Sequence, residues 1–262
     1  MTRKGFWIVG GLALSVIAAG QVSGQQSVFS MKPYLAKEAV PDSLKLDPPP
    51  PANGSAEEAR DKAAQKAAVK LQGTPRFALA ARDADLTSPQ ATSAFSCAAG
   101  VAIGPVTTPK IDALLRRTMG SFGLASAPTK QKYMRKRPFV VNGKPTCTPT
   151  QEGMLRTNGS YTSGHSGIGW GMSLVLAEIF PDRTAELVAR GRAFGDSRRI
   201  CNVHWLSDVE QGQVVASAVF ARLQSVPEFQ ADLAAAREEA KAVAGRQAPA
   251  SCDAEAAALA LK

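Results

Sequence analysis

The two histidines are the residues of this chain best suited to catalysis. His165 and His204 are the only histidines in 262 residues, which argues against a zinc site built on several imidazoles. His204 precedes Asp208 by four residues, a spacing that would place both on one face of a helix. The carboxylate would then bind the Nδ1–H group and leave Nε2 unprotonated, as a nucleophile or a base. An ordinary surface pair would show the same spacing.

His165 belongs to the segment 159–166, Gly-Ser-Tyr-Thr-Ser-Gly-His-Ser, directly before an apolar stretch. A turn of small residues that runs into a helix N-terminus presents free backbone N–H groups and the positive end of the helix dipole, which suit phosphate or another oxyanion. The alternative is a flexible loop in which Ser163 only caps the helix. A charged histidine is unfavourable in the first turn of a helix, so its position there calls for a functional explanation.

A third segment, 130–138, supplies positive charge and reads Lys-Gln-Lys-Tyr-Met-Arg-Lys-Arg-Pro. Taken alone, it fits a solvated basic helix end that Pro138 stops. Arg137 and Arg198, however, could each make bidentate contacts to a tetrahedral oxyanion, and Lys130 adds a point charge. Together with the two histidines and the backbone N–H groups, these cations predict metal-free phosphoryl transfer through a phosphohistidine.

The elements that must position these residues are predicted to be helices. Apolar residues recur at helical spacing, and no segment shows sustained alternation with a period of two. The simplest account is a single all-α domain, with a loop rich in Pro, Gly, Thr and Asn over residues 138–159. The expected helices cover residues 55–73, 76–85, 109–119, 166–180, 183–194, 204–223 and 228–243.

The first 24 residues are predicted to be a secretory signal peptide. Arg3 and Lys4 precede an apolar run from Phe6 to Ala19, and small residues follow up to Gly24. The run is shorter than the roughly 20 residues that span a membrane, which argues against an anchor. Cleavage after Gly24 would leave 238 residues, lower the formal charge from +9 to +7 and deliver the protein to a bacterial periplasm.

The rest of the chain is expected to have three parts. Residues 25–54 form an extended, Pro-rich N-terminal segment, and residues 55–244 form the helical domain. Residues 245–262 form an Ala-rich C-terminal tail that is loosely packed apart from Cys252. Because only a few of the cations are expected to be ligands, nucleic-acid binding is not needed to explain the positive net charge.

The four cysteines, Cys97, Cys147, Cys201 and Cys252, are expected to form two disulfides in an oxidising compartment. Four cysteines allow three pairings, and the sequence alone does not choose among them. The pairing Cys147–Cys201 is favoured because each cysteine lies close to one of the motifs above. Cys97 would then pair with Cys252 and tether the tail.

The motifs resemble those of a known superfamily. Lys-x6-Arg-Pro, Ser-Gly-His and Ser-Arg-x5-His-x3-Asp are similar to the three-part signature of the type 2 phosphatidic acid phosphatases. Gly159 to Ser166 looks like the corresponding motif of bacterial class A non-specific acid phosphatases, and the resemblance extends over roughly residues 34–229. Thr162 stands where that family has proline, and Ser166 where it has threonine. Neither departure removes a phosphate ligand or a catalytic group.

The resemblance implies an all-α helical bundle of the acid phosphatase and vanadium haloperoxidase type. It implies that His204, oriented by Asp208, is the nucleophile, and that His165 is the general acid and later the base. It also implies a set of phosphate ligands, namely Lys130, Arg137, Ser163, Gly164 and Arg198. The expected activity is hydrolysis of a broad range of small phosphate monoesters at acidic pH, with no metal and no cofactor, by an enzyme that is often a homo-oligomer.

Two alternatives stay open at this point. Vanadium haloperoxidases hold vanadate in the same kind of oxyanion site, so the chain could belong with them. The chain could also be a periplasmic anion-binding protein without catalysis, although the presence of both histidines and Asp208 argues against that. A membrane-bound lipid phosphatase would need spanning segments, and the mature chain has no stretch long and apolar enough to provide them.

Overall fold

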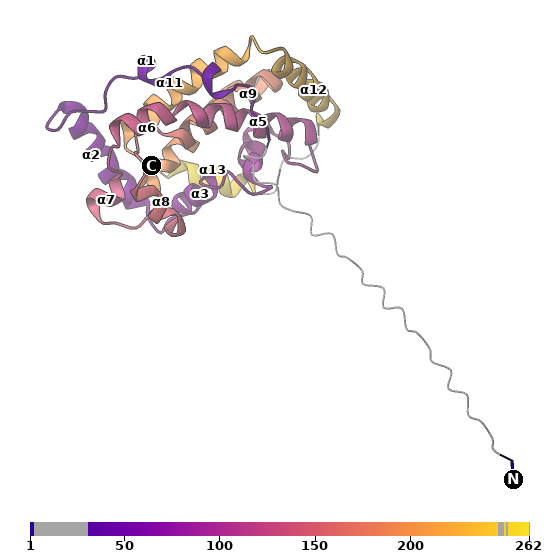
Figure 1. Cartoon of the computed structure of the whole chain (residues 1–262), viewed down its shortest axis with the longest axis horizontal. Helices are drawn as coiled ribbons and strands as arrows, with labels where there is room; N and C mark the ends of the chain where they lie inside the picture. The colour runs from indigo at the N-terminus through magenta and orange to yellow at the C-terminus, as the bar shows by residue number, and fades with distance from the viewer. Residues whose placement is uncertain (3–30, 246–248, 250, 262) are drawn as a thin grey trace.

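The computed structural model describes residues 1–2, 31–245, 249 and 251–261. The predicted signal peptide and its cleavage site fall almost entirely among residues 3–30, outside the described residues. The described part contains helices and no β-strand, which confirms the all-α class (Figure 1). Its α-helices are α1 (Ser43–Leu46), α2 (Ala56–Ala68), α3 (Pro75–Asp83), α4 (Ser96–Ala99), α5 (Pro109–Ala125), α6 (Ala127–Tyr133), α7 (Pro138–Asn142), α8 (Glu152–Arg156), α9 (Gly164–Ile179), α10 (Thr184–Ile200), α11 (Leu206–Leu223), α12 (Pro227–Val243) and α13 (Cys252–Ala260). Short 3-10 helices are η2 (Lys37–Ala39), η3 (Val69–Leu71), η4 (Ala91–Phe95), η5 (Pro149–Gln151) and η6 (Pro181–Arg183).

Helix α9 is the central helix, and α5, α10 and α11 pack around it. Its neighbours come close because α9 has glycine where they cross it. A Cβ atom at Gly169 would overlap the ring of Phe194, and one at Gly171 would overlap the ring of Phe122. These two glycines therefore let α10 and α5 lie directly against the backbone of α9.

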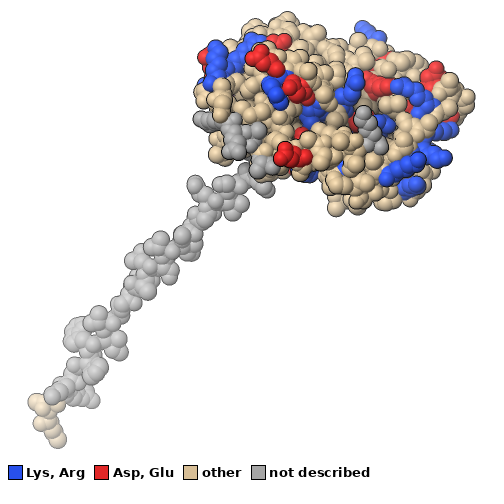
Figure 2. Space-filling view, turned by 180° about the vertical axis from the view of Figure 1, so that it is seen from behind, with Lys and Arg blue, Asp and Glu red and all other residues tan. Residues whose placement is uncertain are grey.

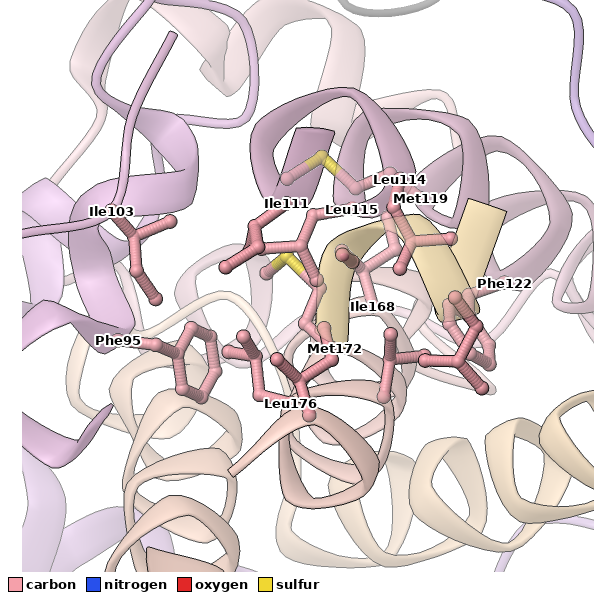
Figure 3. Packing of buried hydrophobic residues seen from close by; sticks show 14 of the residues in the cluster. Phe95, Ile103, Ile111, Leu114, Leu115, Met119, Phe122, Ile168, Met172 and Leu176 are labelled. Carbon is pink, nitrogen blue, oxygen red and sulfur yellow. The ribbon is translucent and has the colours of Figure 1, made fainter. Parts of the chain in front are cut away.

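The main hydrophobic core lies between α5 and α9 (Figure 3). Ile111, Leu115 and Phe122 of α5 point toward Ile168 and Met172 of α9, and all five are buried. Burial of a side chain of this size contributes roughly 1.5–3 kcal/mol to stability. The core thereby fixes α9, whose N-terminus carries the Ser-Gly-His motif.

A second, smaller apolar cluster holds the turn that follows α10. It combines Phe139 of α7 and Leu155 of α8 with Ile200, Cys201 and Val203. Figure 1 shows α2, α7 and α8 at the same end of the molecule, with α12 at the opposite end. This cluster surrounds the turn on which His204 lies.

Both predicted disulfides are present. The bond between Cys147 and Cys201 joins the segment before α8 to the end of α10. The bond between Cys97 and Cys252 joins α4 to α13. The favoured pairing is therefore confirmed.

Several expected boundaries differ from the observed ones. Helix α5 continues beyond Met119 to Ala125, because its two later glycines lie against neighbouring chain and do not end it. Pro138 was expected to stop the basic helix, but α6 already ends at Tyr133, and Pro138 is the first residue of α7. The segment 138–159 was expected to be a loop, but it contains α7, η5 and α8.

The two ends of the described chain are also more structured than expected. Residues 31–54 are not wholly extended, because they include η2 and α1, and Tyr34 and Leu35 are buried in the main core. In the C-terminal tail, residues 252–260 form α13, where Glu255 accepts a hydrogen bond from buried Arg190 at 3.1 Å. Residues 48–52 lie outside helices, as the proline run predicted.

Figure 2 shows how charged side chains are distributed on one face of the molecule. On the face drawn in Figure 2, Lys and Arg side chains lie scattered, with Asp and Glu side chains among them. This distribution agrees with the expectation that most of the cations have no common ligand. Among the described helices, none combines the length and the apolar character needed to cross a membrane.

Candidate active site

The three motifs meet at one cavity of about 600 Å³. Six of the predicted site residues line it, namely Lys130, Arg137, Gly164, His165, Arg198 and His204. Ser163 and Asp208 lie behind this lining and are fully buried. The cavity therefore brings together side chains from α6, α9 and α10 and from the turns before α7 and α11.

His204 and Asp208 are in contact, but the expected geometry was wrong. His204 is not on a helix, because α11 begins only at Leu206. Asp208 instead lies in the first turn of α11, where Oδ2 accepts the backbone N–H of Trp205 at 2.9 Å. The same oxygen lies 3.3 Å from Nδ1 of His204. The carboxylate of Asp208 thus both caps α11 and orients the imidazole of His204.

The protonation state of His204 follows from its two neighbours. Nε2 lies 3.0 Å from Nη1 of Arg137, and a guanidinium can only donate. Nε2 must therefore accept, which places the proton on Nδ1, facing Asp208. Burial and the charge of Arg137 hold the pKa of His204 well below its usual value, so the ring is neutral.

Arg137 is held by backbone carbonyls from several segments. Its Nε donates to the carbonyls of Leu155 and Asn158 at 3.0 and 3.1 Å. Its other nitrogens donate to the carbonyls of Val203 and Gly159 at 3.0 and 3.2 Å. These contacts fix the guanidinium at the edge of the cavity, and burial lowers its pKa to about 10.

Arg198 is the least satisfied polar group of the cavity wall. Only 1% of this residue is exposed, yet its Nε and Nη1 atoms have no hydrogen-bond partner in the described part of the chain. Leaving a buried donor unpaired costs about 1–3 kcal/mol, more when it is charged. Burial and the nearby Arg137 lower its pKa to about 9. A site that carries this cost is suited to an anion that would satisfy the donors.

Lys130 adds a third cation, whose hydrogen-bond partners are neutral carbonyl groups. Its ammonium group donates to the carbonyls of Gly159 and Ser160 at 3.0 and 3.2 Å. Burial and the neighbouring Arg137 lower its pKa to about 7. Gly159 is required here, since a Cβ atom would overlap the Lys130 carbonyl.

The N-terminus of α9 adds hydrogen-bond donors to the cavity wall. Ser163 caps the helix, as its Oγ accepts the N–H of Ser166 at 3.2 Å, and its own N–H donates to the backbone carbonyl of Asp208 at 2.9 Å. Gly164 and His165 are the first residues of α9, where backbone N–H groups have no acceptor within the helix. The predicted turn running into a helix is therefore present.

His165 has the opposite tautomer from His204. Its Nε2 lies 3.1 Å from the carbonyl oxygen of Ala84, which can only accept, so Nε2 carries the proton. This leaves Nδ1 as the ring nitrogen available to a ligand. Burial and the charge of Arg198 hold the pKa of His165 well below its usual value. In the unliganded site both histidines are neutral.

Thr162, which replaces the proline of the resembling family, is held by hydrogen bonds. Its N–H donates to Oγ1 of Thr129 at 3.3 Å, and the two hydroxyl oxygens lie 3.2 Å apart. Both residues are fully buried. Threonine has a backbone N–H group that proline lacks, and Thr129 of α6 provides the acceptor for it.

Sequence reasoning missed two charged residues behind the histidine pair. Arg135 donates to Oδ1 of Asp208 at 2.6 Å and to Oδ2 of Asp61 at 2.7 Å. Arg135 belongs to the basic segment but resembles the lysines around it. Asp61 lies on α2, far away in the sequence and in a run of ordinary charged residues, so no local signal marks it.

Comparison with known proteins identifies a family and several relatives. Residues 114–229 match the family model of the PAP2 superfamily. A non-specific acid phosphatase of Salmonella typhimurium is 42% identical over 220 residues, which are 83% of this chain and 88% of that protein. One from Providencia stuartii is 43% identical over 207 residues, 79% of this chain and 84% of that protein. An acid phosphatase of Zymomonas mobilis is 35% identical over 232 residues, 88% of this chain and 85% of that protein.

Proposed function

This chain belongs to the PAP2 superfamily and is an acid phosphatase that hydrolyses phosphate monoesters, and we propose that it does so through a phosphohistidine on His204 without a metal ion. One observation carries the proposal. The unprotonated Nε2 of His204 and the unpaired donors of Arg198 border the same cavity. A phosphoryl group placed there would meet a nucleophile and the cations that neutralise its charge.

In the first step, Nε2 of His204 attacks phosphorus while the bond between phosphorus and the ester oxygen breaks. His165 gives a proton from Nδ1 to the departing alkoxide, so the alcohol leaves neutral. Asp208 stabilises the positive charge that develops on the imidazole of His204. The products of this step are the alcohol and a phosphohistidine.

In the second step, water attacks the phosphorus of the phosphohistidine. Nδ1 of His165 takes the proton from this water, and the bond between nitrogen and phosphorus breaks. His204 regains its Nε2 lone pair, and His165 holds the proton while phosphate is bound. When inorganic phosphate leaves, His165 returns to the neutral form of the empty site and takes up a proton again when the next phosphate ester binds.

The remaining predicted ligands would bind the phosphoryl oxygens. Lys130, Arg137 and Arg198 contribute charge, and Gly164 contributes a backbone N–H group at the start of α9. The Oγ atom of Ser163 already accepts two hydrogen bonds within the first turn, so its hydroxyl proton is what it can donate to phosphate. These donors would surround the phosphoryl oxygens and stabilise the negative charge on them in the transition state.

The test uses p-nitrophenyl phosphate. We expect hydrolysis that resists EDTA and is inhibited by vanadate, and we expect His204→Ala to abolish turnover. The p-nitrophenolate ion leaves without needing a proton, so His165→Asn should release about one p-nitrophenolate per chain in a burst and then turn over slowly. Lys132→Ala, an exposed neighbour of Lys130, serves as the control and should keep full activity.

Three results would overturn the proposal. Wild-type turnover by His204→Ala would remove this residue as the nucleophile. Loss of activity in EDTA that added metal restores would remove the metal-free mechanism. After vanadate loading, peroxide and bromide should give no halogenated product; a halogenated product would place the chain with the haloperoxidases instead.

We further propose that the enzyme is secreted to the periplasm after cleavage at Gly24, accepts a broad range of small phosphate monoesters and assembles as a homo-oligomer. The charged and then apolar N-terminal sequence supports export. N-terminal sequencing of protein from the periplasmic fraction tests the cleavage, with Gln25 expected as the first residue. A panel of phosphate monoesters tests the specificity, and light scattering tests the oligomeric state.

A further inference from the structure

We propose that Arg135 is a positioning residue that acts on His204 through Asp208, and that Asp61 holds Arg135 in place. The inference rests on the proposed role of His204 as the nucleophile. It extends the His–Asp pair to a chain of four side chains that begins on α2 and ends at the cavity. Arg135 and Asp61 would then set the geometry and the charge of the catalytic carboxylate without touching substrate.

The contacts of this chain are short and mutually consistent. Arg135 uses Nη1 for Asp208 at 2.6 Å and Nη2 for Asp61 at 2.7 Å, so one guanidinium bridges two carboxylates. Ser207 adds a second link, because its N–H and its hydroxyl donate to Asp61 at 2.8 and 2.6 Å. Asp61 therefore holds both Arg135 and the first turn of α11, to which Asp208 belongs.

Burial gives these contacts their force. The side chains of Asp61 and Asp208 are 2% and 0% exposed, and that of Arg135 is 13% exposed. A buried carboxylate without a partner is strongly unfavourable. Loss of the contact between Arg135 and either Asp61 or Asp208 would therefore cost stability. The one remaining oxygen of Asp208, Oδ2, faces Nδ1 of His204 and the backbone N–H of Trp205. Arg135 thus leaves the imidazole only one orientation in which to find its acceptor.

Arg135 also favours the ionised form of Asp208, although burial still leaves the pKa of this carboxyl group above its usual value. Burial raises the pKa of Asp208, whereas the charge and the hydrogen bond of Arg135 lower it. The other titratable or charged groups around Asp208 are His204, Asp61, Lys130, Arg137 and Tyr161. Without Arg135 the carboxyl group would keep its proton to a higher pH, and a protonated carboxyl group is a poor acceptor for Nδ1–H.

The positions of Arg135 and Asp61 separate their proposed role from substrate binding. Arg135 and Asp61 do not line the cavity that holds the two histidines. They line a different hollow of about 390 Å³, on the side of Trp205 and Lys62. A change at Arg135 should therefore alter the chemical step more than it alters the binding of substrate.

The experiment compares the double variant Asp61→Asn/Arg135→Gln with wild type. The negative charge of Asp61 and the positive charge of Arg135 are removed together. Asp208 is then the carboxylate of this network that has lost its cationic partner. We expect kcat to fall roughly tenfold or more, the size of effect seen for the hydrogen-bond partners of metal-binding histidines, while KM stays within about twofold. The acid limb of the kcat profile should move to higher pH, and Arg135→Lys should recover part of kcat.

A second ion pair of similar burial provides the control. Arg116 and Asp112 of α5 have side-chain exposures of 12% and 8% and lie 2.8 Å apart. Asp112→Asn/Arg116→Gln should lower thermal stability but leave kcat and its pH profile as in wild type. This variant measures what the loss of a buried pair does when it is not linked to His204.

Each outcome decides between the two roles. A folded Asp61→Asn/Arg135→Gln variant with wild-type kcat and an unmoved acid limb overturns the inference. So does a variant that loses kcat only in proportion to folded protein, as judged by circular dichroism and by the Asp112/Arg116 control. If His204→Ala is itself active, the proposed function fails, and that result is separate from any result at Arg135.

Discussion

Arg137 donates from Nη1 to Nε2 of His204 over 3.0 Å, so a cation of the cavity wall is paired with the proposed nucleophile before substrate arrives. Only the tautomer with its proton on Nδ1 fits this contact, because the guanidinium has donors and no lone pair. A phosphate ester would compete for both partners, since its oxygens accept from Arg137 and its phosphorus accepts the lone pair of Nε2. The pair keeps His204 in its reactive protonation state.

The first prediction concerns the two tautomers. With only two histidines in the chain, nitrogen NMR of protein labelled in histidine should show one Nδ1–H ring, His204, and one Nε2–H ring, His165. Both pKa values lie well below the usual value, so both rings should remain neutral at pH 6. His165→Asn assigns the signals. A protonated ring at pH 6, or two rings with the same tautomer, would contradict the geometry.

The second prediction concerns the proton that His165 must carry if it is the general acid that we propose. Burial and the cations near His165, Arg198 first among them, lower its pKa in the empty site. An anion bound between the cations offsets their charge, so the pKa of His165 should rise when phosphate or vanadate binds. The same NMR spectra should show His165 gaining a proton on titration with vanadate at pH 6. Calorimetry in buffers of different ionisation enthalpy should show matching proton uptake, which His165→Asn should abolish.

The third prediction sets stability against activity at Arg198. Arg198→Met removes a buried charge with two unpaired donor nitrogens, and should therefore raise the free energy of unfolding by about 1–3 kcal/mol. It should also lower kcat/KM by about 10²- to 10³-fold, as loss of one oxyanion donor does. Urea unfolding and p-nitrophenyl phosphate kinetics measure the two effects.

Arg199 is the matched control for this change. It follows Arg198 on α10, but its guanidinium is paired with Asp196 at 2.8 Å. Arg199→Met should leave kcat/KM unchanged and should not stabilise the protein. Destabilisation by Arg198→Met would show that the guanidinium has partners in the empty site after all.

The sequence predicted the composition of the site better than its geometry. The three motifs carry their residue types in fixed order, so Lys130, His165 and His204 could be picked out before any fold was known. The position of His204 before α11 could not be predicted in the same way. Whether a residue belongs to a helix or to the turn before it depends on the packing around it. Asp61 was invisible for the same reason: a charged residue on α2 acquires its role only when tertiary packing brings it to Arg135.

The fourth prediction separates the two disulfides. Loop-entropy estimates give about 4 kcal/mol for Cys147–Cys201, which closes a separation of 54 residues, and about 5 kcal/mol for Cys97–Cys252, with a separation of 155. Removing the second pair by Cys→Ser changes should cost more stability. Removing the first should cost more activity, because the segment after Cys147 carries the Leu155 and Asn158 carbonyls that hold Arg137. Urea unfolding and kcat/KM, measured on both double variants, should rank them in opposite orders.

The fifth prediction concerns stability against pH. Asp47 is buried, neither carboxylate oxygen has a partner in the described part of the chain, and burial raises its pKa from 3.8 to about 7. The folded state therefore binds a proton that the unfolded state releases between about pH 4 and pH 7, so this group makes stability fall as the pH rises through that range. Asp47→Asn, which stays neutral, should gain roughly 1–3 kcal/mol over wild type at pH 8 and little at pH 4. Urea unfolding at both pH values measures the difference. Equal effects at the two values would mean that Asp47 is ionised in the folded protein throughout, with a partner for its charge.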